Sequence, residues 1–429
     1  MTLDRMHGLI SRLPGLRWLT ALLAMAPLAM TSTATAAEVA YYDAIYRATF
    51  KAGNEHAAVE LELKGEKLPS KVVLRADPKR YRNFRSNQPL EVGATEIVWH
   101  PQGKQSSLRY EFDVNHRRAS GSYDSYITKD WALFRGDKLT PSTRVTAARN
   151  LRSHTTLEFK LPPGWSAVTP YAPTGDHSFR VEDPKRRFDA PAGWMLVGKI
   201  GVRSERIHHV NTLIAAPEGE SARRQDALAF INWNLPKLLD VFPDFPKRVL
   251  IVSAGDPMWR GGLSGPASIF LHSDRPLISE NRTSPLLHEL VHVALGIRGD
   301  NESDWIVEGL AEFYSIQTLR RSGGIGQKRY DQAMDNLKKW ARRAPTLFAK
   351  SSTGPTTARA VLVFQQVDSE IRALTGGAAS LDDVARKLAA DRGEISLIQL
   401  QEIAQQVAGK PLQSLQRDRL TKPLVAPGP

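Results

Sequence analysis

Two histidines and two glutamates in the second half of the chain have the types and spacing that a catalytic metal site requires. His288 and His292 are four residues apart, so on a helix both imidazoles point to the same side and can reach one metal ion. Glu289 lies about 100° further around that helix than the first histidine, where its carboxylate can accept a proton from a metal-activated water. Glu308 offers a third ligand and leaves one coordination position open. The pattern predicts one zinc ion per chain, held by His288, His292 and Glu308, with Glu289 as the general base.

The residues around these groups indicate two helices that would position them. Ser284 can cap the first helix, Pro285 suits its first turn, and Gly296 can end it. An ordinary amphipathic helix would not explain two histidines and a glutamate in an apolar run, because an unpaired buried charge is costly. The second helix is expected from about 304 to 322. On it Glu312 shares a face with the third ligand and could orient a liganding histidine; the alternative is a surface carboxylate.

This arrangement of two helices resembles that of the gluzincin metallopeptidases, the thermolysin-like fold group. More narrowly, the chain resembles the glycyl aminopeptidase family, in which a β-rich N-terminal domain precedes the catalytic domain. The resemblance spans about residues 40 to 415 and implies a zinc peptidase that acts on a peptide or protein substrate. The metal motif is specific by itself, and the other matching stretches count through their order and spacing. These stretches are Trp131–Gly136, Leu161–Trp165, Gly261–Leu263, Val367–Arg372, Thr375–Gly377 and Ser380–Asp383.

The resemblance also implies a substrate-binding segment before the metal helices, where this chain departs from the family. In the family, Gly-Gly-Leu is usually followed by Glu-His, and that glutamate helps to hold the free amino group of the substrate. Ser264–Gly265 take those positions here, so exopeptidase and endopeptidase action both stay open, and Asp256 could substitute for the carboxylate. We expect Ser268–Leu271 to form an edge strand that pairs with extended substrate backbone. The implied substrate-binding residues are Gly261, Gly262, Leu263 and Ser268.

A second departure concerns the group that would stabilise the oxyanion. Family members have a tyrosine shortly before the helix that contains Val361, whereas this chain has Thr356 or a neighbour there and no tyrosine after Tyr330. Losing one oxyanion donor can cost roughly 100- to 1,000-fold in rate. The spacer of 15 residues between His292 and Glu308 is also shorter than in the family, which indicates a trimmed loop over the site. The candidate replacements for the tyrosine are Tyr314, Tyr330, His272 and Arg260.

These departures leave three interpretations open. The first is an active zinc peptidase, which is favoured because all three ligands and Glu289 are retained. The second is a catalytically weak or inactive zinc-containing envelope protein that binds peptides. The third is an enzyme that hydrolyses a peptidoglycan-type peptide.

The N-terminus predicts export. Arg5, Arg12 and Arg17 precede an apolar run at 18–30, and small residues follow it, which is the order of a secretory signal peptide. The run is short of the roughly 20 residues that cross a bilayer, so we expect cleavage after Ala36 or the next alanine and no integral membrane segment afterwards. The chain has no cysteine, which excludes disulfides and thiolate ligands. A bacterial periplasm fits best, and release outside the cell is the alternative.

The pattern of elements predicts an α+β fold. Short alternating runs such as Ala57–Leu63 and Thr155–Leu161, separated by turn residues, are typical of antiparallel strands. After about residue 200 the chain becomes mixed and then helical. Together with the resemblance, this predicts an antiparallel β-sandwich-like N-terminal domain followed by a thermolysin-like, mainly helical zinc-peptidase domain. The expected boundaries are 1–36 for the signal peptide, 37–200 for the β-rich domain, 201–420 for the catalytic domain and 421–429 for a flexible tail.

The charge of the chain bears on its partners. The sequence has 58 basic and 45 acidic residues, and removing residues 1–36 leaves 55 and 44, a net charge of +11. The positive residues are dispersed and no nucleic-acid-binding module is visible, so we expect no nucleic-acid partner. A basic surface is compatible with anionic envelope surfaces or acidic substrates. The sequence leaves the oligomeric state open.

Overall fold

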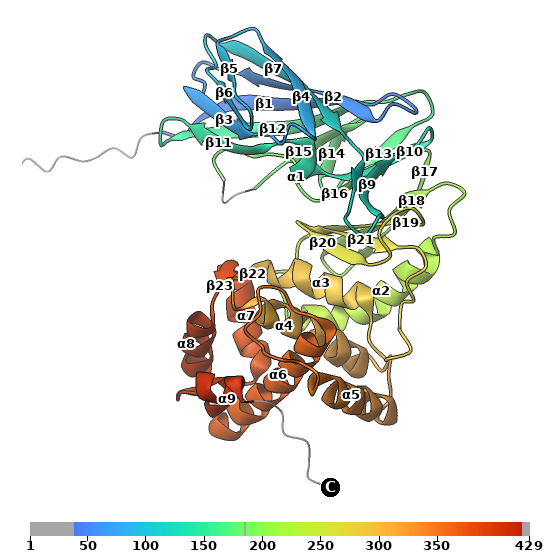
Figure 1. The fold of residues 1–429 in the computed structure, drawn as a ribbon, viewed down its shortest axis with the longest axis vertical. Coiled ribbons are helices and arrows are strands. Elements are labelled where there is room, and N and C mark those ends of the chain that lie inside the picture. Colours follow the sequence, from blue (N-terminus) through green and yellow to red (C-terminus); the bar gives the residue numbers. More distant parts are fainter. Residues whose placement is uncertain (1–37, 184–185, 423–429) are drawn as a thin grey trace, which may run out of the picture. The chain divides into compact units, whose positions relative to one another are not determined.

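Strands come first and helices later in the computed structural model, which describes residues 38–183 and 186–422 (Figure 1). The predicted signal peptide and residues 423–429 of the predicted tail lie outside the described residues. Contacts group the chain from Val39 onward into one unit. Among the described residues, no helix has the length and apolar character that crossing a bilayer demands. The order of elements agrees with the predicted α+β class, a sheet-rich N-terminal part before a helical part.

Three sheets make up the N-terminal part. Burial alternates along its long strands, as a sheet with one face on a core requires. In β1 (Ala40–Thr49), Tyr42, Ala44 and Tyr46 are buried while Tyr41 is half exposed. Inward side chains from all three sheets form one hydrophobic cluster. The first sheet has the strand order β14 (Ala172–Gly175), β15 (Ser178–Val181), β12 (Leu151–Lys160), β1, β2 (His56–Lys64), β7 (Gln105–Asp113), β4 (Tyr81–Ser86). The second has the order β13 (Ser166–Val168), β16 (Trp194–Gly198), β10 (Trp131–Arg135), β9 (Tyr123–Ile127), β8 (His116–Arg117). The third has the order β11 (Ser142–Thr146), β3 (Lys71–Arg75), β6 (Glu96–Trp99), β5 (Leu90–Val92).

One central pair of strands runs in parallel. β1 and β12 pair from Ala40 opposite Leu151 to Thr49 opposite Lys160. Every other neighbouring pair in the described parts of these three sheets is antiparallel. The prediction of an antiparallel N-terminal domain therefore does not hold at this pair. Alternating hydrophobicity identifies a strand but carries no information about the direction of its neighbour.

A fourth sheet carries the segment that leads to the metal helices. Its order is β17 (Ile200–Ile207), β18 (Val210–Pro217), β19 (Arg248–Ala254), β21 (Ser268–His272), β20 (Gly262–Gly265). Both faces of its central strands β18, β19 and β21 are largely buried. Ile251 and Ile269 pack with α2 (Arg224–Leu239) and α3 (Pro285–Leu295), whereas Val252 and Phe270 pack on the opposite face against Trp194 of β16. Strands buried on both faces are nearly continuous apolar runs, as β19 and β21 are.

The edge of this sheet is β20. β21 lies inside the sheet, paired with β19 on one side and β20 on the other, so the prediction that Ser268–Leu271 forms an edge strand is wrong. All five residues of β21 are buried, whereas the four residues of β20 are half-buried. The sequence Gly-Leu-Ser-Gly of β20 has too few side chains to show the alternating pattern of a strand.

Helices dominate the remainder of the chain (Figure 1). The predicted helix from 304 to 322 is confirmed as α4 (Asp304–Arg321). Its side chains pack with those of α3 and of α6 (Gly354–Thr375), and the ring centroids of Trp305 and Phe364 stack 5.7 Å apart. The other elements are α1 (Gly136–Leu139) in the N-terminal part, α5 (Gln327–Ala341), α7 (Leu381–Asp391), α8 (Leu397–Ala408), a 3-10 helix η1 (Gln413–Leu415), α9 (Arg417–Thr421), and the parallel pair β22 (Ile297–Gly299) and β23 (Gly393–Ile395).

α4 and α6 approach each other closely at a glycine. A Cβ added to Gly309 would lie 2.5 Å from the Ala360 Cβ and 2.9 Å from Phe364 Cε2. Gly309 follows Glu308 directly, so this contact fixes the segment of α4 that carries the predicted third ligand. Here the glycine serves packing between helices, because a side chain would force them apart.

We predict that Gly309→Ala destabilises the protein by about 1–3 kcal/mol, since an extra methyl must be accommodated in a filled interface. Thermal unfolding monitored by circular dichroism would measure the change. The sign is informative, because in an uncrowded helix the same substitution stabilises by up to about 1 kcal/mol. An unchanged or raised Tm would contradict the close approach of α4 and α6.

Candidate metal centre

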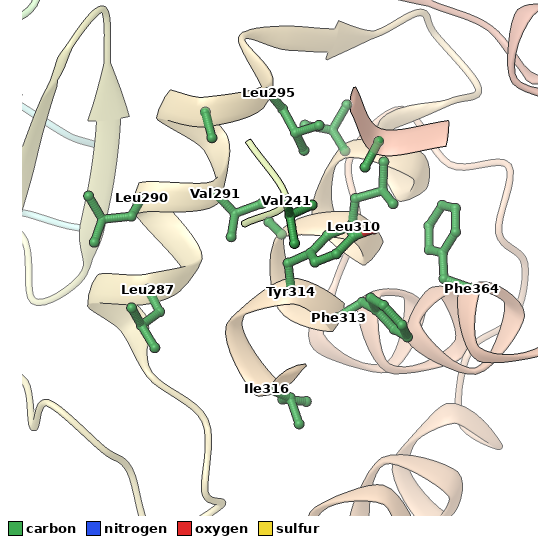
Figure 2. Close-up of a cluster of buried hydrophobic side chains, with 14 of the residues drawn as sticks. Val241, Leu287, Leu290, Val291, Leu295, Leu310, Phe313, Tyr314, Ile316 and Phe364 are labelled. Atoms are coloured by element: carbon green, nitrogen blue, oxygen red, sulfur yellow. The ribbon is translucent and has the colours of Figure 1, made fainter. Parts of the chain in front are cut away.

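α3 carries the two histidines and has the ends that the sequence predicts. The Ser284 side chain accepts a hydrogen bond from the Leu287 N–H at 3.2 Å, and Gly296 ends the helix in the left-handed conformation. Apolar side chains such as Leu290 are buried along this helix (Figure 2). The side chains of His288 and His292 are only 17% and 14% exposed. Both therefore lie largely out of water, which is where a metal ion competes best for them.

α4 brings the carboxylates to these histidines. Glu308 contacts both imidazoles, and Glu312, one turn later, contacts His288. Two buried serines hold the helices in this register, because the Ser284 N–H donates to Ser315 Oγ at 3.3 Å and the Ser315 hydroxyl donates to the Ser284 carbonyl at 3.0 Å. Nothing in the sequence points to Ser315, since its role depends on the position of another helix.

The distances among the three predicted ligands fit a tetrahedral zinc ion. His288 Nε2 lies 3.1 Å from His292 Nε2 and 3.3 Å from Glu308 Oε2, and His292 Nε2 lies 3.4 Å from Glu308 Oε1. Atoms that are each about 2.0–2.1 Å from a tetrahedral zinc are about 3.3 Å from one another. In the described part of the chain, these three residues form the group of possible ligands whose atoms all lie within 4.8 Å of one another. The structure thus brings together the residues that the sequence pattern singled out.

Glu312 has the contact that an orienting role requires. Its Oε2 lies 3.0 Å from His288 Nδ1. With the ring proton on Nδ1, this hydrogen bond leaves the Nε2 lone pair directed at the other ligands. The side chain is 16% exposed, which does not match the alternative of a surface carboxylate.

The carboxylates favour the charged form of His288, whereas burial disfavours that of His292. Burial lowers the pKa of His288, but hydrogen bonds to Glu308 and Glu312 outweigh it and raise the pKa to about 10. Burial, and then the charge on His288, lower the pKa of His292 to about 4. Burial alone would raise the pKa of Glu308, but its hydrogen bond to His288 and the charges of both histidines bring it below the usual value. This concentration of negative charge is the setting that a divalent cation needs.

The Glu289 carboxyl lies against the edge strand β20. A Cβ added to Gly262 would be 2.9 Å from Glu289 Cγ and 3.1 Å from Oε1, so only glycine leaves room for the carboxyl there. Burial raises the pKa of Glu289, and the charge of His288 and hydrogen bonds from the Ser264 hydroxyl and N–H reduce this rise. Glu289 therefore combines a raised pKa with a fixed position, both of which suit a general base.

None of the other three predicted substrate-binding residues lies on the face of the sheet that carries Glu289. Gly261 precedes β20, and Leu263 packs on the face opposite α3. Ser268 is fully buried on that opposite face, where its hydroxyl donates to the Pro266 carbonyl at 3.1 Å and accepts from the Trp194 N–H at 2.7 Å. The prediction that Ser268 binds substrate is therefore wrong, because its hydrogen bonds are made inside the protein.

The structure does not bring the two tyrosine candidates for the oxyanion donor to the ligands. The Tyr314 ring lies among apolar side chains (Figure 2), and its hydroxyl donates to Asp382 Oδ1 of α7 at 3.1 Å. The Tyr330 hydroxyl accepts from Gln317 Nε2 at 3.0 Å. Gln317 is nine residues after Glu308, which places it on the opposite side of α4. The predictions of Tyr314 and Tyr330 as oxyanion donors are therefore wrong, because both hydroxyls bind other side chains. The sequence does not reveal these partners.

The polar candidates on β21 and the loop before β20 are also held elsewhere. The buried His272 shares a face of its sheet with Phe270, opposite α3, and its Nδ1 accepts from the Asp274 N–H at 3.2 Å. Arg260 forms an ion pair with Asp256, the residue considered as a substitute carboxylate. Thr356, aligned with the missing tyrosine, is buried and its hydroxyl lies 3.3 Å from that of Thr353. None of these side chains is placed at the ligand group.

Comparison with known proteins identifies the fold. No protein-family model and no curated protein matches the sequence. An aminopeptidase N family protein from Idiomarina loihiensis superposes with a TM-score of 0.61 at 14% identity, over 81% of this chain and 70% of that one. Yeast LTA4 hydrolase gives 0.55 at 11% identity, over 91% and 69%. Aminopeptidase A from Legionella pneumophila, solved with aspartic acid, gives 0.51 at 14% identity, over 88% and 48%.

These likenesses show that the chain shares its fold with an aminopeptidase N family protein and with LTA4 hydrolase. At such low sequence identity, these likenesses are evidence of a shared fold and of nothing more specific. The narrower resemblance to the glycyl aminopeptidase family and the thermolysin-like detail stay predictions.

We predict that Glu312→Gln weakens zinc binding about 10- to 100-fold, because the hydrogen bond that orients His288 loses its charged acceptor. Competition with a chromophoric chelator would measure the affinity. Glu402→Gln is the matched control, since Glu402 is exposed on α8. Equal affinities of the two variants would contradict the orienting role of Glu312.

We further predict that Gly262→Ala lowers any Glu289-dependent rate about 100-fold while zinc content is unchanged, because the added methyl displaces the carboxyl and leaves the ligands in place. Steady-state kinetics and metal analysis on the same sample would test this. Gly265→Ala is the control on the same strand, since its added Cβ would meet Ser268 Oγ at 3.3 Å on the other face. An unaltered rate in Gly262→Ala would refute the placement of Glu289.

Proposed function

We propose that this chain is an exported zinc peptidase in which Glu289 is the general base. The observation that carries the proposal is the ligand triangle of His288, His292 and Glu308, with sides of 3.1–3.4 Å, beside a carboxyl that lies against an edge strand. The fold shared with an aminopeptidase N family protein and with LTA4 hydrolase supports peptide hydrolysis as the reaction.

Each residue has a distinct part in this mechanism. A zinc ion bound by the three ligands would supply Lewis-acid activation of the water and of the scissile carbonyl. Glu289 accepts the proton of the attacking water and then delivers it to the nitrogen of the leaving amine, which balances the protons over the reaction. Burial raises the pKa of the Glu289 carboxyl, and hydrogen bonding by Ser264 reduces this rise and so favours the ionised form that can accept a proton. Glu312 keeps the His288 ring in the orientation that presents Nε2.

The edge strand β20 offers the binding surface for an extended peptide. β20 is last in the order of its sheet, and within the described residues it pairs only with β21. A peptide aligned along its outer side would receive main-chain hydrogen bonds and lie beside Glu289. The backbone of Gly261, Gly262 and Leu263 would take part in this binding. Such binding would not require the Glu and His side chains that follow Gly-Gly-Leu in the family.

One observation favours a second candidate, a catalytically weak or inactive zinc protein that binds peptides. Tyr314, Tyr330 and His272, the predicted oxyanion donors, are engaged elsewhere. Peptide binding along β20 would be the same in both cases, so the two proposals differ only in turnover. Export to the periplasm, with release outside the cell as the alternative, belongs to both.

We predict one zinc per chain in the purified mature protein and cleavage of a mixed peptide library that is lost on chelation. Glu289→Gln should retain zinc and lose cleavage, because the ligands remain and the base is removed. His292→Ala should lose zinc and cleavage together. Metal analysis by mass spectrometry and identification of library fragments would measure both properties.

The outcomes separate the interpretations. Zinc without Glu289-dependent cleavage would replace the peptidase proposal with the binding protein. A His292→Ala variant that keeps one zinc per chain would refute the ligand assignment. The positions of the cuts would distinguish exopeptidase from endopeptidase action, and peptidoglycan-type peptides in the library would test the third interpretation.

A further inference from the structure

A cavity of about 340 Å³ adjoins the ligand group through Glu312. Its wall is formed by Asn281 and Thr283 of the loop before α3, by Glu312 of α4, and by one face of α5 and the turn after it. Glu312 is also the residue that contacts His288. A group bound in this cavity would therefore lie beside Glu312, one residue away from the ligand His288 and on its Nδ1 side. The size is at the lower end of ligand pockets and suits a single side chain.

The α5 wall of the cavity has an apolar side and a cationic side. Ala333 and Leu337 are buried, and Trp340, with 43% of its surface exposed, lies one turn further along the same face. Lys339 and Arg343 form the other side together with the Asn336 amide. The cavity thus offers apolar surface for a side-chain stem and cations for its end.

The two cations of the cavity are not neutralised by an ion pair. Among the described residues, neither Lys339 nor Arg343 forms a salt bridge, whereas the adjacent Lys338 is paired with Asp335 at 3.2 Å. Glu312 is the carboxylate of the wall, and it already contacts His288 Nδ1. Asn281 and Asn336 add neutral amide groups, so the free charge facing the cavity is positive.

From this arrangement we infer that the cavity is a specificity pocket for a carboxylate-bearing group of the substrate. The inference rests on the proposed peptidase function and names its substrate class, peptides with an acidic group beside the cleaved bond. Lys339 and Arg343 bind the carboxylate, while Leu337 and Trp340 contact the methylene groups that lead to it. The carboxylate can come from an acidic side chain or from the C-terminus of a short peptide.

The test uses the full mature protein with zinc and two sets of matched peptides. One set has Glu or Gln at each position that flanks the cleaved bond, and the other has a free or an amidated C-terminus two residues from it. Wild type should prefer the carboxylate-bearing member of at least one pair about tenfold in kcat/KM, as expected for two partly exposed ion pairs. The pair that shows the preference identifies the source of the carboxylate.

Two variants connect this preference to the cavity. Lys339→Ala combined with Arg343→Ala should reduce the preference to about one, since both cations are removed. Lys338→Ala is the matched control on the same helix, because Lys338 is already paired and does not line the cavity. No preference in wild type, or a preference that the double variant retains, would overturn the inference.

Binding measured without turnover separates this inference from the proposed function. In the Glu289→Gln background, fluorescence anisotropy of the same labelled peptides reports the preference as a ratio of Kd values, again about tenfold. If the ratio of Kd values depends on Lys339 and Arg343 but the wild type cleaves no peptide, the specificity pocket is supported and the peptidase proposal is refuted. If the wild type cleaves peptides but the Kd values show no preference for the carboxylate, the peptidase proposal is supported and the specificity pocket is refuted.

Discussion

The rest of the metal centre depends on one constraint, that α3 and α4 hold two imidazoles and a carboxylate within about 3.4 Å of one another largely out of water. Three ionisable groups in so small a volume are unfavourable unless each has a partner. Glu312 supplies one such partner. The paired hydrogen bonds of Ser284 and Ser315 join α3 to α4, and the close contact at Gly309 holds α4 against α6. The packing of the helical part therefore determines the geometry of the ligands.

The sequence was sufficient wherever the information is local. Two histidines one turn apart, a serine cap and a terminal glycine are properties of one helix, and α3 has all three. It was insufficient where a residue's role depends on a partner far along the chain. Tyr314 contacts an aspartate 68 residues later, and β21 lies inside its sheet because a glycine-rich segment pairs with it. The parallel pairing of β1 with β12 is of the same kind, since periodicity is identical for both strand directions.

The sheet that supports the site is held from its other face by the N-terminal part. The backbone N–H of Trp194 on β16 donates a hydrogen bond to the Ser268 hydroxyl on β21. The backbone of Tyr123 on β9 donates to the Pro257 carbonyl and accepts from the Trp259 N–H, both in the segment before β20. Arg118 of the same N-terminal part lies 4.5 Å above the Trp259 ring. These contacts hold β21 and the loop that leads into β20, and β20 in turn pairs with β21. The sheet-rich part thus helps to fix the strand against which Glu289 lies.

Ser264 stands where the predicted resemblance to the glycyl aminopeptidase family would place a glutamate, and this bears on how the site could recognise a substrate. A carboxylate at the end of Gly-Gly-Leu would place a fixed negative charge beside the general base and attract an ammonium group. Ser264 is neutral, so it offers no such attraction, and hydrogen bonding by it only reduces the rise that burial causes in the pKa of Glu289. Asp256, a nearby carboxylate in the sequence, is paired with Arg260. In the proposed function, recognition through charge would fall to the opposite sign, at Lys339 and Arg343, while the backbone of β20 would hold the peptide without regard to its sequence.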